Sequence, residues 1–170
     1  MPTLVQEELQ QKARSFADNA VLKTYEIKNV DDLDRPVSLK YSFTAPQYFI
    51  KAGPIRIMDQ LASIDTTPFF KVTRRYPIEF SGLDLQEDRI EIELPTRFAV
   101  KYLPPPVEVQ TPWFYFVSRY ELVSEHFIRH HFVHEIKKDR VEVNEYEAYK
   151  KSVEEIASKV NQHVVLEEKK

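Results

Sequence analysis

Four histidines gather in one short segment, at positions His126, His130, His131 and His134. If this segment were helical, His130 and His134 would stand one turn apart and could chelate a metal ion. The same segment is rich in Phe, Ile and Val, which favours a strand. Residues four apart on a strand are separated by about 13 Å, too far for one metal ion to bridge. We therefore predict no metal bound at these histidines.

Carboxylates form two further candidate groups. Glu91 and Glu93 alternate along a predicted strand, whereas Asp31, Asp32 and Asp34 crowd one predicted turn. Paired acids can serve a glycosidase or bind calcium, but both uses require a second, convergent group and a concave site. We interpret the two groups as a solvated strand face and a turn.

Nucleophiles and cofactor loops are also poorly supported. Ser118, Ser124 and Ser152 could each join a histidine, but none lies in a G-x-S-x-G elbow. The chain has no cysteine, which excludes a thiolate nucleophile, thiolate metal sites and disulfides. Its two glycines, Gly53 and Gly82, lie in no phosphate-binding pattern. We predict no catalytic residue and no cofactor, so that this chain is not an enzyme.

Consecutive aromatic residues run from Trp113 to Phe116. They could form a platform for a sugar or a peptide, with Trp113 and Tyr115 as the candidate ligand contacts. Alternating aromatics are also typical of the two faces of one packed strand. Exposure decides between these alternatives, since rings that line a groove favour binding and rings beneath a helix favour packing.

Composition limits the classes of partner. The 170 residues include 24 basic and 27 acidic residues spread along the chain, for a net charge of −3, which favours neither nucleic acid nor an anionic membrane. No apolar run reaches the roughly 20 residues of a membrane helix, and the first residues lack the features of a signal peptide. We expect a soluble chain.

Apolar periodicity predicts the elements that hold these residues. Residues 4–20 have helical spacing. Period-two alternation or short apolar runs predict strands at 21–27, 37–44, 47–52, 55–58, 69–80, 89–94, 100–103, 113–123 and 126–138. Short strands separated by turn signals predict a mainly β fold, namely an antiparallel β-sandwich of about seven to nine strands with a C-terminal helix packed on it and a short N-terminal helix.

The C-terminal helix is predicted to begin near Asn144, with Glu147 completing a capping box. Its apolar stripe runs from Tyr146 to Val164 and must pack on something, for which the sheet is the natural partner. The predicted organisation is an N-terminal helical segment or linker over residues 1–20, a β-sandwich domain with its helix over 21–166, and a frayed tail over 167–170.

Three segments follow one another in a recognisable order: RRYPIEF at 74–80, RIEIELP at 89–95 and VKYLP at 100–104. A long hairpin and a terminal helix containing Tyr146 come after them. Over roughly residues 20–165, this order resembles the β-rich domain that follows the transglutaminase-like domain in multidomain bacterial proteins.

The resemblance implies that any catalytic Cys-His-Asp lies upstream, outside this cysteine-free chain. It implies a non-catalytic accessory or interaction domain of a larger bacterial transglutaminase-like, peptidase-like protein, whose partner is the neighbouring domain. Export of such proteins implies a periplasmic or cell-surface location. The alternative is an independent carbohydrate- or peptide-binding β-sandwich. The ligand, the strand order and the oligomeric state stay open.

Overall fold

The computed structural model describes residues 2–169, which divide into two compact units, 1–50 and 51–170. In the first unit, helix α1 (Pro2–Phe16) precedes the antiparallel strands β1 (Val21–Lys28) and β2 (Ser38–Thr44). The amide of Gln10 ties the helix to β1, since its Nε2 donates to the carbonyl of Ala20 and its Oε1 accepts from the N–H of Leu22.

The connection between β1 and β2 turns at Asn29, which adopts a positive φ of 63°. Its side-chain amide donates to the carbonyl of Pro36 across the loop, at 3.0 Å. Asn is one of the few residues that accept this backbone conformation, so the Asn- and Asp-rich segment forms the turn that its composition predicts. The strands predicted at 21–27 and 37–44 are confirmed.

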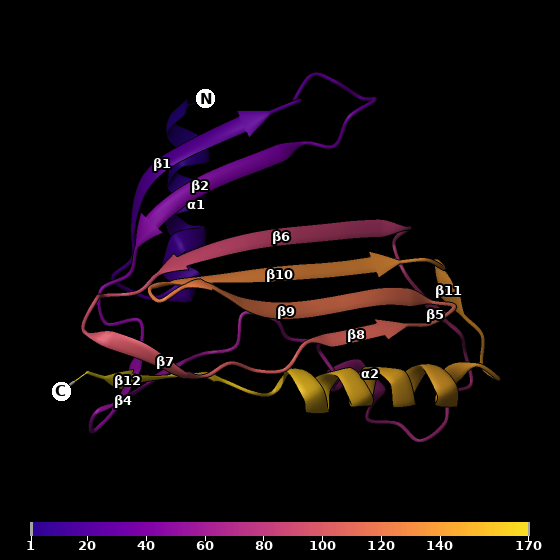
Figure 1. Ribbon diagram of the computed structural model, residues 1–170. Coiled ribbons are helices and arrows are strands. Elements are labelled where there is room, and N and C mark those ends of the chain that lie inside the picture. Colours follow the sequence, from indigo (N-terminus) through magenta and orange to yellow (C-terminus); the bar gives the residue numbers. More distant parts are fainter. Residues whose placement is uncertain (1, 170) are drawn as a thin grey trace. The chain divides into compact units, whose positions relative to one another are not determined.

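The second unit contains a four-stranded antiparallel sheet in the order β6-β10-β9-β8 (Figure 1). Its strands are β6 (Asp84–Glu93), β8 (Val107–Gln110), β9 (Phe114–Ser124) and β10 (Phe127–Ile136). The predicted hairpin at Ser124-Glu125 is confirmed, because β9 and β10 pair along their length on either side of it. We refer to these strands as the main sheet.

A second antiparallel sheet has the order β3-β4-β12-β7. It contains β3 (Ile50–Ala52), β4 (Ile55–Met58), β7 (Phe98–Tyr102) and β12 (Val164–Glu168). The turn between β3 and β4 uses Gly53 at a φ of 60°, a conformation that glycine adopts without a side-chain penalty. Two short strands, β5 (Ile78–Glu79) and β11 (Arg140–Val141), form a separate pair.

Helix α2 (Tyr146–Val160) runs along one face of the main sheet, with β4, β7 and β12 on the same side (Figure 1). The helix buries residues at i, i+3 and i+4 spacing, namely Tyr146, Tyr149, Val153, Ile156 and Val160. Together with Trp113, with Phe114 and Phe116 of β9, and with Phe69 from the one-turn helix η1 (Thr67–Phe69), they form the principal core.

The mainly β, antiparallel fold with a short N-terminal helix and a packed C-terminal helix is confirmed. The described residues contain twelve strands, more than the predicted seven to nine, because β5, β8, β11 and β12 are short or lack clear alternation. Strands β1 and β2 belong with α1 to the first unit, whereas the prediction grouped them with residues up to 166.

Three expectations about the C-terminal part are wrong. Helix α2 begins at Tyr146, and its N-cap residue Glu145 makes no side-chain capping bond, so the predicted capping box of Asn144 and Glu147 does not form. Val164 belongs to β12 rather than to the helix. Glu167 and Glu168 are also in β12 and pair with β7, so the predicted frayed tail does not begin at 167. Lys170 lies outside the described residues.

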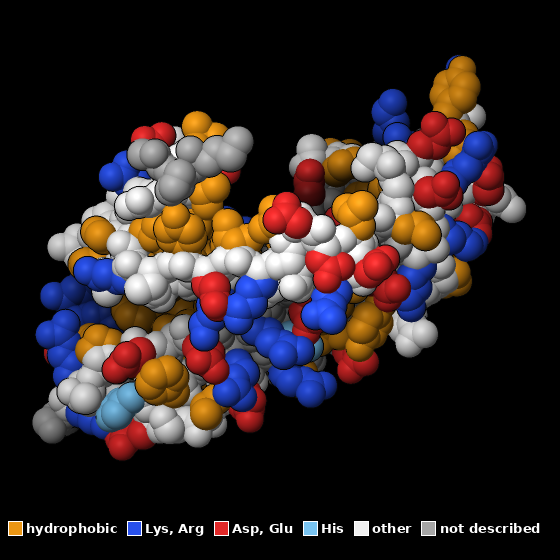
Figure 2. Space-filling view, turned by 90° about the horizontal axis from the view of Figure 1, so that it is seen from above, with side chains coloured by type: hydrophobic (Ala, Val, Ile, Leu, Met, Phe, Trp, Pro, Cys, Tyr) orange, Lys and Arg blue, Asp and Glu red, His pale blue; other side chains and the backbone are white. Residues whose placement is uncertain are grey.

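Neither described helix has the length and apolarity that crossing a membrane requires. On the face of the molecule drawn in Figure 2, acidic and basic side chains are interspersed rather than separated by sign.

Candidate functional site

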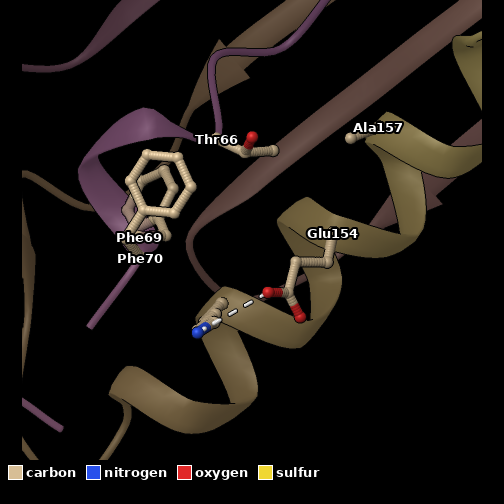
Figure 3. A pocket seen from close by; sticks show the side chains of 6 residues that line it. Thr66, Phe69, Phe70, Glu154 and Ala157 are labelled. Atoms are coloured by element: carbon tan, nitrogen blue, oxygen red, sulfur yellow. Dashed lines mark ion pairs between the residues drawn. The ribbon is translucent and has the colours of Figure 1, made fainter. Parts of the chain in front are cut away.

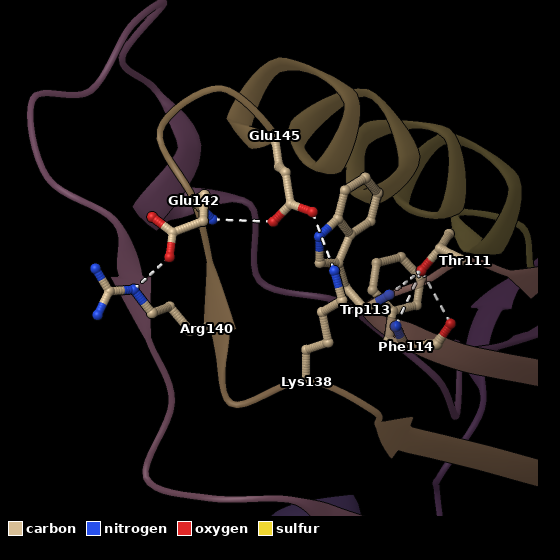
Figure 4. Close-up of polar contacts among 7 residues, drawn as sticks. All are labelled: Thr111, Trp113, Phe114, Lys138, Arg140, Glu142 and Glu145. Atoms are coloured by element: carbon tan, nitrogen blue, oxygen red, sulfur yellow. Dashed lines mark hydrogen bonds and ion pairs between the residues drawn. The ribbon is translucent and has the colours of Figure 1, made fainter.

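Trp113 lies in the core rather than on a binding platform. Only 7% of the side chain is exposed, and its ring packs edge-on against Tyr149 of α2, with ring centroids 5.6 Å apart. Trp113 immediately precedes β9, where a turn closed by Thr111 folds the indole toward the helix: Thr111 Oγ1 accepts from the N–H groups of Trp113 and Phe114 (Figure 4). This burial beneath a helix is the arrangement that favours packing over ligand binding.

Tyr115 points to the other face of β9 and is half-buried. Its hydroxyl donates to Glu108 of the adjacent strand β8 at 2.8 Å, and Lys137 lies over its ring, 5.3 Å from the centroid. The hydrogen bond to Glu108 raises the pKa of Tyr115. The two predicted ligand contacts, Trp113 and Tyr115, therefore do not come together on one surface.

A polar network holds the start of α2 against the end of β10 (Figure 4). The carboxylate of Glu145 accepts from the backbone N–H of Glu142 at 3.1 Å and from Lys138 Nζ at 3.0 Å. The backbone bond to Glu142, then Lys138, then the neighbouring Trp113 lower the pKa of Glu145. Glu142 also pairs with Arg140 at 2.8 Å. This network replaces the capping box that the sequence predicted.

Three of the four histidines occupy a strand, as predicted, and are divided between its two faces. His130 and His134 share the core-facing side of β10, whereas His131 lies on the opposite face and contacts Glu87 of β6 at 2.8 Å. His126 lies in the turn before β10. Within residues 2–169, no group of three or more His, Cys, Asp or Glu side chains is arranged to hold a metal ion.

One serine and one histidine do meet. Ser118 Oγ and His130 Nε2 are 3.0 Å apart, and the two residues are 5% and 0% exposed. The ring of Tyr120 packs on the imidazole with centroids 4.4 Å apart. Burial lowers the pKa of His130 to about 4, so the imidazole is neutral near pH 7. Neither side chain reaches the surface, and the pair fills the core between β9 and β10.

The most exposed large apolar side chains of the second unit lie in a segment that sequence reasoning assigned wrongly. The predicted strand at 69–80 is a loop over residues 70–77, preceded by η1 and followed by β5. Phe70, Val72 and Tyr76 are 78%, 82% and 78% exposed. Apolar residues occupy both odd and even positions of this segment, so a strand here would have no single apolar face to bury. The segment is instead held in position by contacts with α2.

Helix α2 holds this loop through a single carbonyl. Tyr146 Oη donates to the carbonyl oxygen of Lys71 at 2.8 Å, and Lys150 Nζ donates to the same oxygen at 3.3 Å. Arg74 lies over the ring of Tyr146, 5.6 Å from its centroid. These contacts fix the backbone between Phe70 and Val72, so the two apolar side chains are held outward in a defined position.

A shallow pocket of about 310 Å³ adjoins this loop. Phe69 and Phe70 lie on one side of it, and Glu154 and Ala157 of α2 lie on the other (Figure 3). Lys150 pairs with Glu154 within the lining, at 3.6 Å. We call the loop 70–77 and this pocket the loop surface. Its exposed apolar side chains beside Lys71, Arg74 and Arg75 suit contact with another protein surface.

The chain was compared with curated proteins and with solved structures. Among curated proteins, no sequence matches the chain. One solved structure, described as "a putative protease" from Parabacteroides distasonis, is 12% identical with a TM-score of 0.48. The match covers 58% of this chain and 19% of that one, so this chain spans well under two thirds of that protein.

The family comparison is more extensive. The model of the domain of unknown function DUF3858, a domain with a solved structure, matches residues 55–166. This range begins at β4, ends within β12, and contains the main sheet, α2 and the loop surface. The chain therefore belongs to the DUF3858 family.

Proposed function

We propose that this chain is a non-catalytic accessory domain of a larger bacterial transglutaminase-like protein, and that it docks on the neighbouring domain of that protein through the loop surface. The observation that carries the proposal is the exposure of Phe70 and Val72 on a backbone that Tyr146 and Lys150 hold in place. A few well-placed side chains carry most of the binding energy of a protein interface, and a backbone already held in place loses little conformational freedom on binding.

The charges around these anchors indicate what the partner surface contains. Lys71, Arg74 and Arg75 contribute three positive charges within five residues. A complementary surface would offer an apolar pocket edged by Asp and Glu side chains. The transglutaminase-like neighbour is inferred from the order of sequence segments described above.

A non-catalytic role agrees with the placement of the polar core. Ser118 and His130 are enclosed between strands, and the pocket beside the loop is lined by Lys150 and Glu154 without a serine or histidine. The alternative function, carbohydrate or peptide binding by Trp113 and Tyr115, has less support, because Trp113 packs on Tyr149.

The test is association of this chain with the separately expressed upstream domain of its parent protein, measured by titration calorimetry. We expect the double variant Phe70→Ser/Val72→Ser to bind at least tenfold more weakly, since truncating an interface anchor costs about 2 kcal/mol. Leu122→Ser, which changes a 47%-exposed apolar residue on β9, is the matched control and should bind as the unmodified chain does. Equal affinities of the double variant and the unmodified chain would contradict the proposal.

A further inference from the structure

Strand β6 forms one edge of the main sheet. It pairs with β10 over ten residues without a bulge, and no other strand of residues 2–169 pairs with its second side. Proteins usually blunt such edges with short strands, prolines, bulges or charged side chains, and of these β6 has the charged side chains, which leave the edge to a strand of complementary charge. An open edge of ten regular residues is therefore a place where another extended chain can add to the sheet.

The register identifies which backbone N–H and C=O groups of β6 are not hydrogen-bonded to β10. Leu94 N–H donates to the carbonyl of His126 at 2.8 Å, so these two residues form a hydrogen-bonded pair. Hydrogen-bonded and non-hydrogen-bonded pairs alternate along an antiparallel ladder, and the register of β6 with β10 is unbroken. The residues that direct their N–H and C=O groups away from β10 are therefore Leu85, Glu87, Arg89, Glu91 and Glu93.

The same residues place their side chains on the face of the sheet opposite α2, since the other residues of β6, such as Ile90 and Ile92, face the core. Along the open edge this gives the charge order Glu87, Arg89, Glu91, Glu93. Glu87 contacts Arg89 and His131, and Glu91 contacts Arg129. Glu93 is exposed and makes no ion pair within the described part of the chain.

We propose that the β6 edge binds an extended, basic polypeptide strand from a different protein. In an added antiparallel strand, residues directly opposite the open positions share their face, and opposite charges there attract. The strand that fits carries Lys or Arg opposite Glu87, Glu91 and Glu93 and an acidic residue opposite Arg89. A second copy of this chain presents the same surplus of glutamate, so the charges select a basic partner. This site is separate from the loop surface and does not depend on it.

The experiment uses the full chain and a synthetic peptide in which Lys, Lys, Glu and Lys alternate with Thr. Binding is measured by fluorescence anisotropy at low salt, and amide exchange is followed by NMR. We expect the peptide to slow exchange of the amides of Glu87, Arg89, Glu91 and Glu93, which lie opposite its four charged residues. The amides of Ile90 and Ile92, already bonded to β10, should exchange as before.

Two controls separate strand addition from charge attraction. N-methylation of the peptide's Lys and Glu amides, which face β6, should abolish binding, whereas N-methylation of its Thr amides should not. Glu93→Lys should weaken binding about fivefold, since a cross-strand charge pair contributes up to about 1 kcal/mol. Glu147→Lys, an exposed glutamate on α2, should have no effect.

Unchanged amide exchange, equal affinity of Glu93→Lys, or equal binding of the two N-methylated peptides would overturn the proposal. So would a dimer in which sedimentation and exchange place β6 of one copy against β6 of another. None of these results depends on Phe70 or Val72, so they leave the docking proposal for the loop surface to its own test.

Discussion

The pair of Ser118 and His130 shows how a polar group is accommodated in this core. A neutral imidazole has one donor and one acceptor nitrogen: Nε2 lies 3.0 Å from the serine hydroxyl, Nδ1 is buried with no hydrogen-bond partner within residues 2–169, and Tyr120 covers the ring. Protonation would place a charge on a buried ring with which no carboxylate of residues 2–169 forms an ion pair. Burial therefore makes the charged form unfavourable and makes stability depend on pH.

We predict that the free energy of unfolding falls as pH is lowered from about 6.5 toward 4. The pKa of His130 is about 4 in the folded chain and 6.5 in the unfolded chain, so the unfolded chain binds the proton first. The contribution of His130 is fully present above pH 6.5, is lost progressively below it, and stops changing below pH 4. The full loss is on the order of 3 kcal/mol, measured by urea denaturation at a series of pH values.

The double variant Ser118→Ala/His130→Phe removes both polar partners and should lose most of this pH dependence. His134 has a pKa lowered by burial and contributes in the same direction, so the variant His134→Gln serves as the comparison. If the double variant lost as much stability between pH 6.5 and 4 as the unmodified chain, His130 would not be the source.

Elements with a regular period could be predicted from the sequence, and those held by distant contacts could not. Ile90 and Ile92 alternate with glutamates because one face of β6 is buried, and Tyr149, Val153 and Ile156 recur at helical spacing because α2 packs along one side. The loop at 70–77 has no such pattern. Its position depends on Tyr146 and Lys150, more than 70 residues away in sequence.

The candidate site, too, could be predicted from the sequence only in part. The aromatic segment at 113–116 was identified from the sequence, but the turn at Thr111 that directs Trp113 into the core depends on hydrogen bonds that periodicity does not report. The exposed apolar residues at 70, 72 and 76 share one side of a weak alternation that Arg74 interrupts and that Phe69, on the other side, contradicts. The sequence therefore contains no periodic signal that distinguishes this exposed loop from the predicted strand.

The contact between α2 and the loop predicts a local effect on dynamics. Replacing both donors, in Tyr146→Phe/Lys150→Met, removes the two hydrogen bonds to the carbonyl of Lys71. Amide hydrogens at residues 70–76 should then exchange at least tenfold faster. The neutral bond from Tyr146 and the charge-assisted bond from Lys150 together stabilise the closed loop by more than about 1.4 kcal/mol. Hydrogen exchange with mass spectrometry measures this rate.

The matched control for this experiment is Lys159→Met, which removes a lysine from an exposed ion pair with Glu155 on the same helix. It should leave exchange of the loop unchanged. Equal exchange rates in the double variant and the unmodified chain would mean that the loop is held by its other contacts.

At the scale of the whole molecule, the family match and the principal core coincide. The match to DUF3858 covers residues 55–166, and every residue of the principal core lies within 51–170. The first unit has one helix and a two-stranded sheet, a combination with little apolar area to bury. The two units should therefore differ in their ability to fold alone.

We predict that a fragment of residues 51–170 unfolds cooperatively in urea, with a free energy of about 5–15 kcal/mol, as expected for a domain of this size. The blue-shifted fluorescence of buried Trp113 reports the transition. A fragment of residues 1–50 should show little helical or strand structure by circular dichroism. A non-cooperative transition for 51–170 would mean that its core requires residues before 51.

The position of β12 also determines when the domain can assemble. This last strand lies between β4 and β7, and its partners precede it by about 110 and 65 residues. During synthesis, the hairpin of β9 and β10 can form as soon as residue 136 has left the ribosome. The second sheet lacks its inner strand β12 until residue 168 has also left the ribosome. Until then β4 and β7 present unpaired edges, so the interval of translation between these two points is when the nascent chain is most exposed to aggregation and most dependent on chaperones.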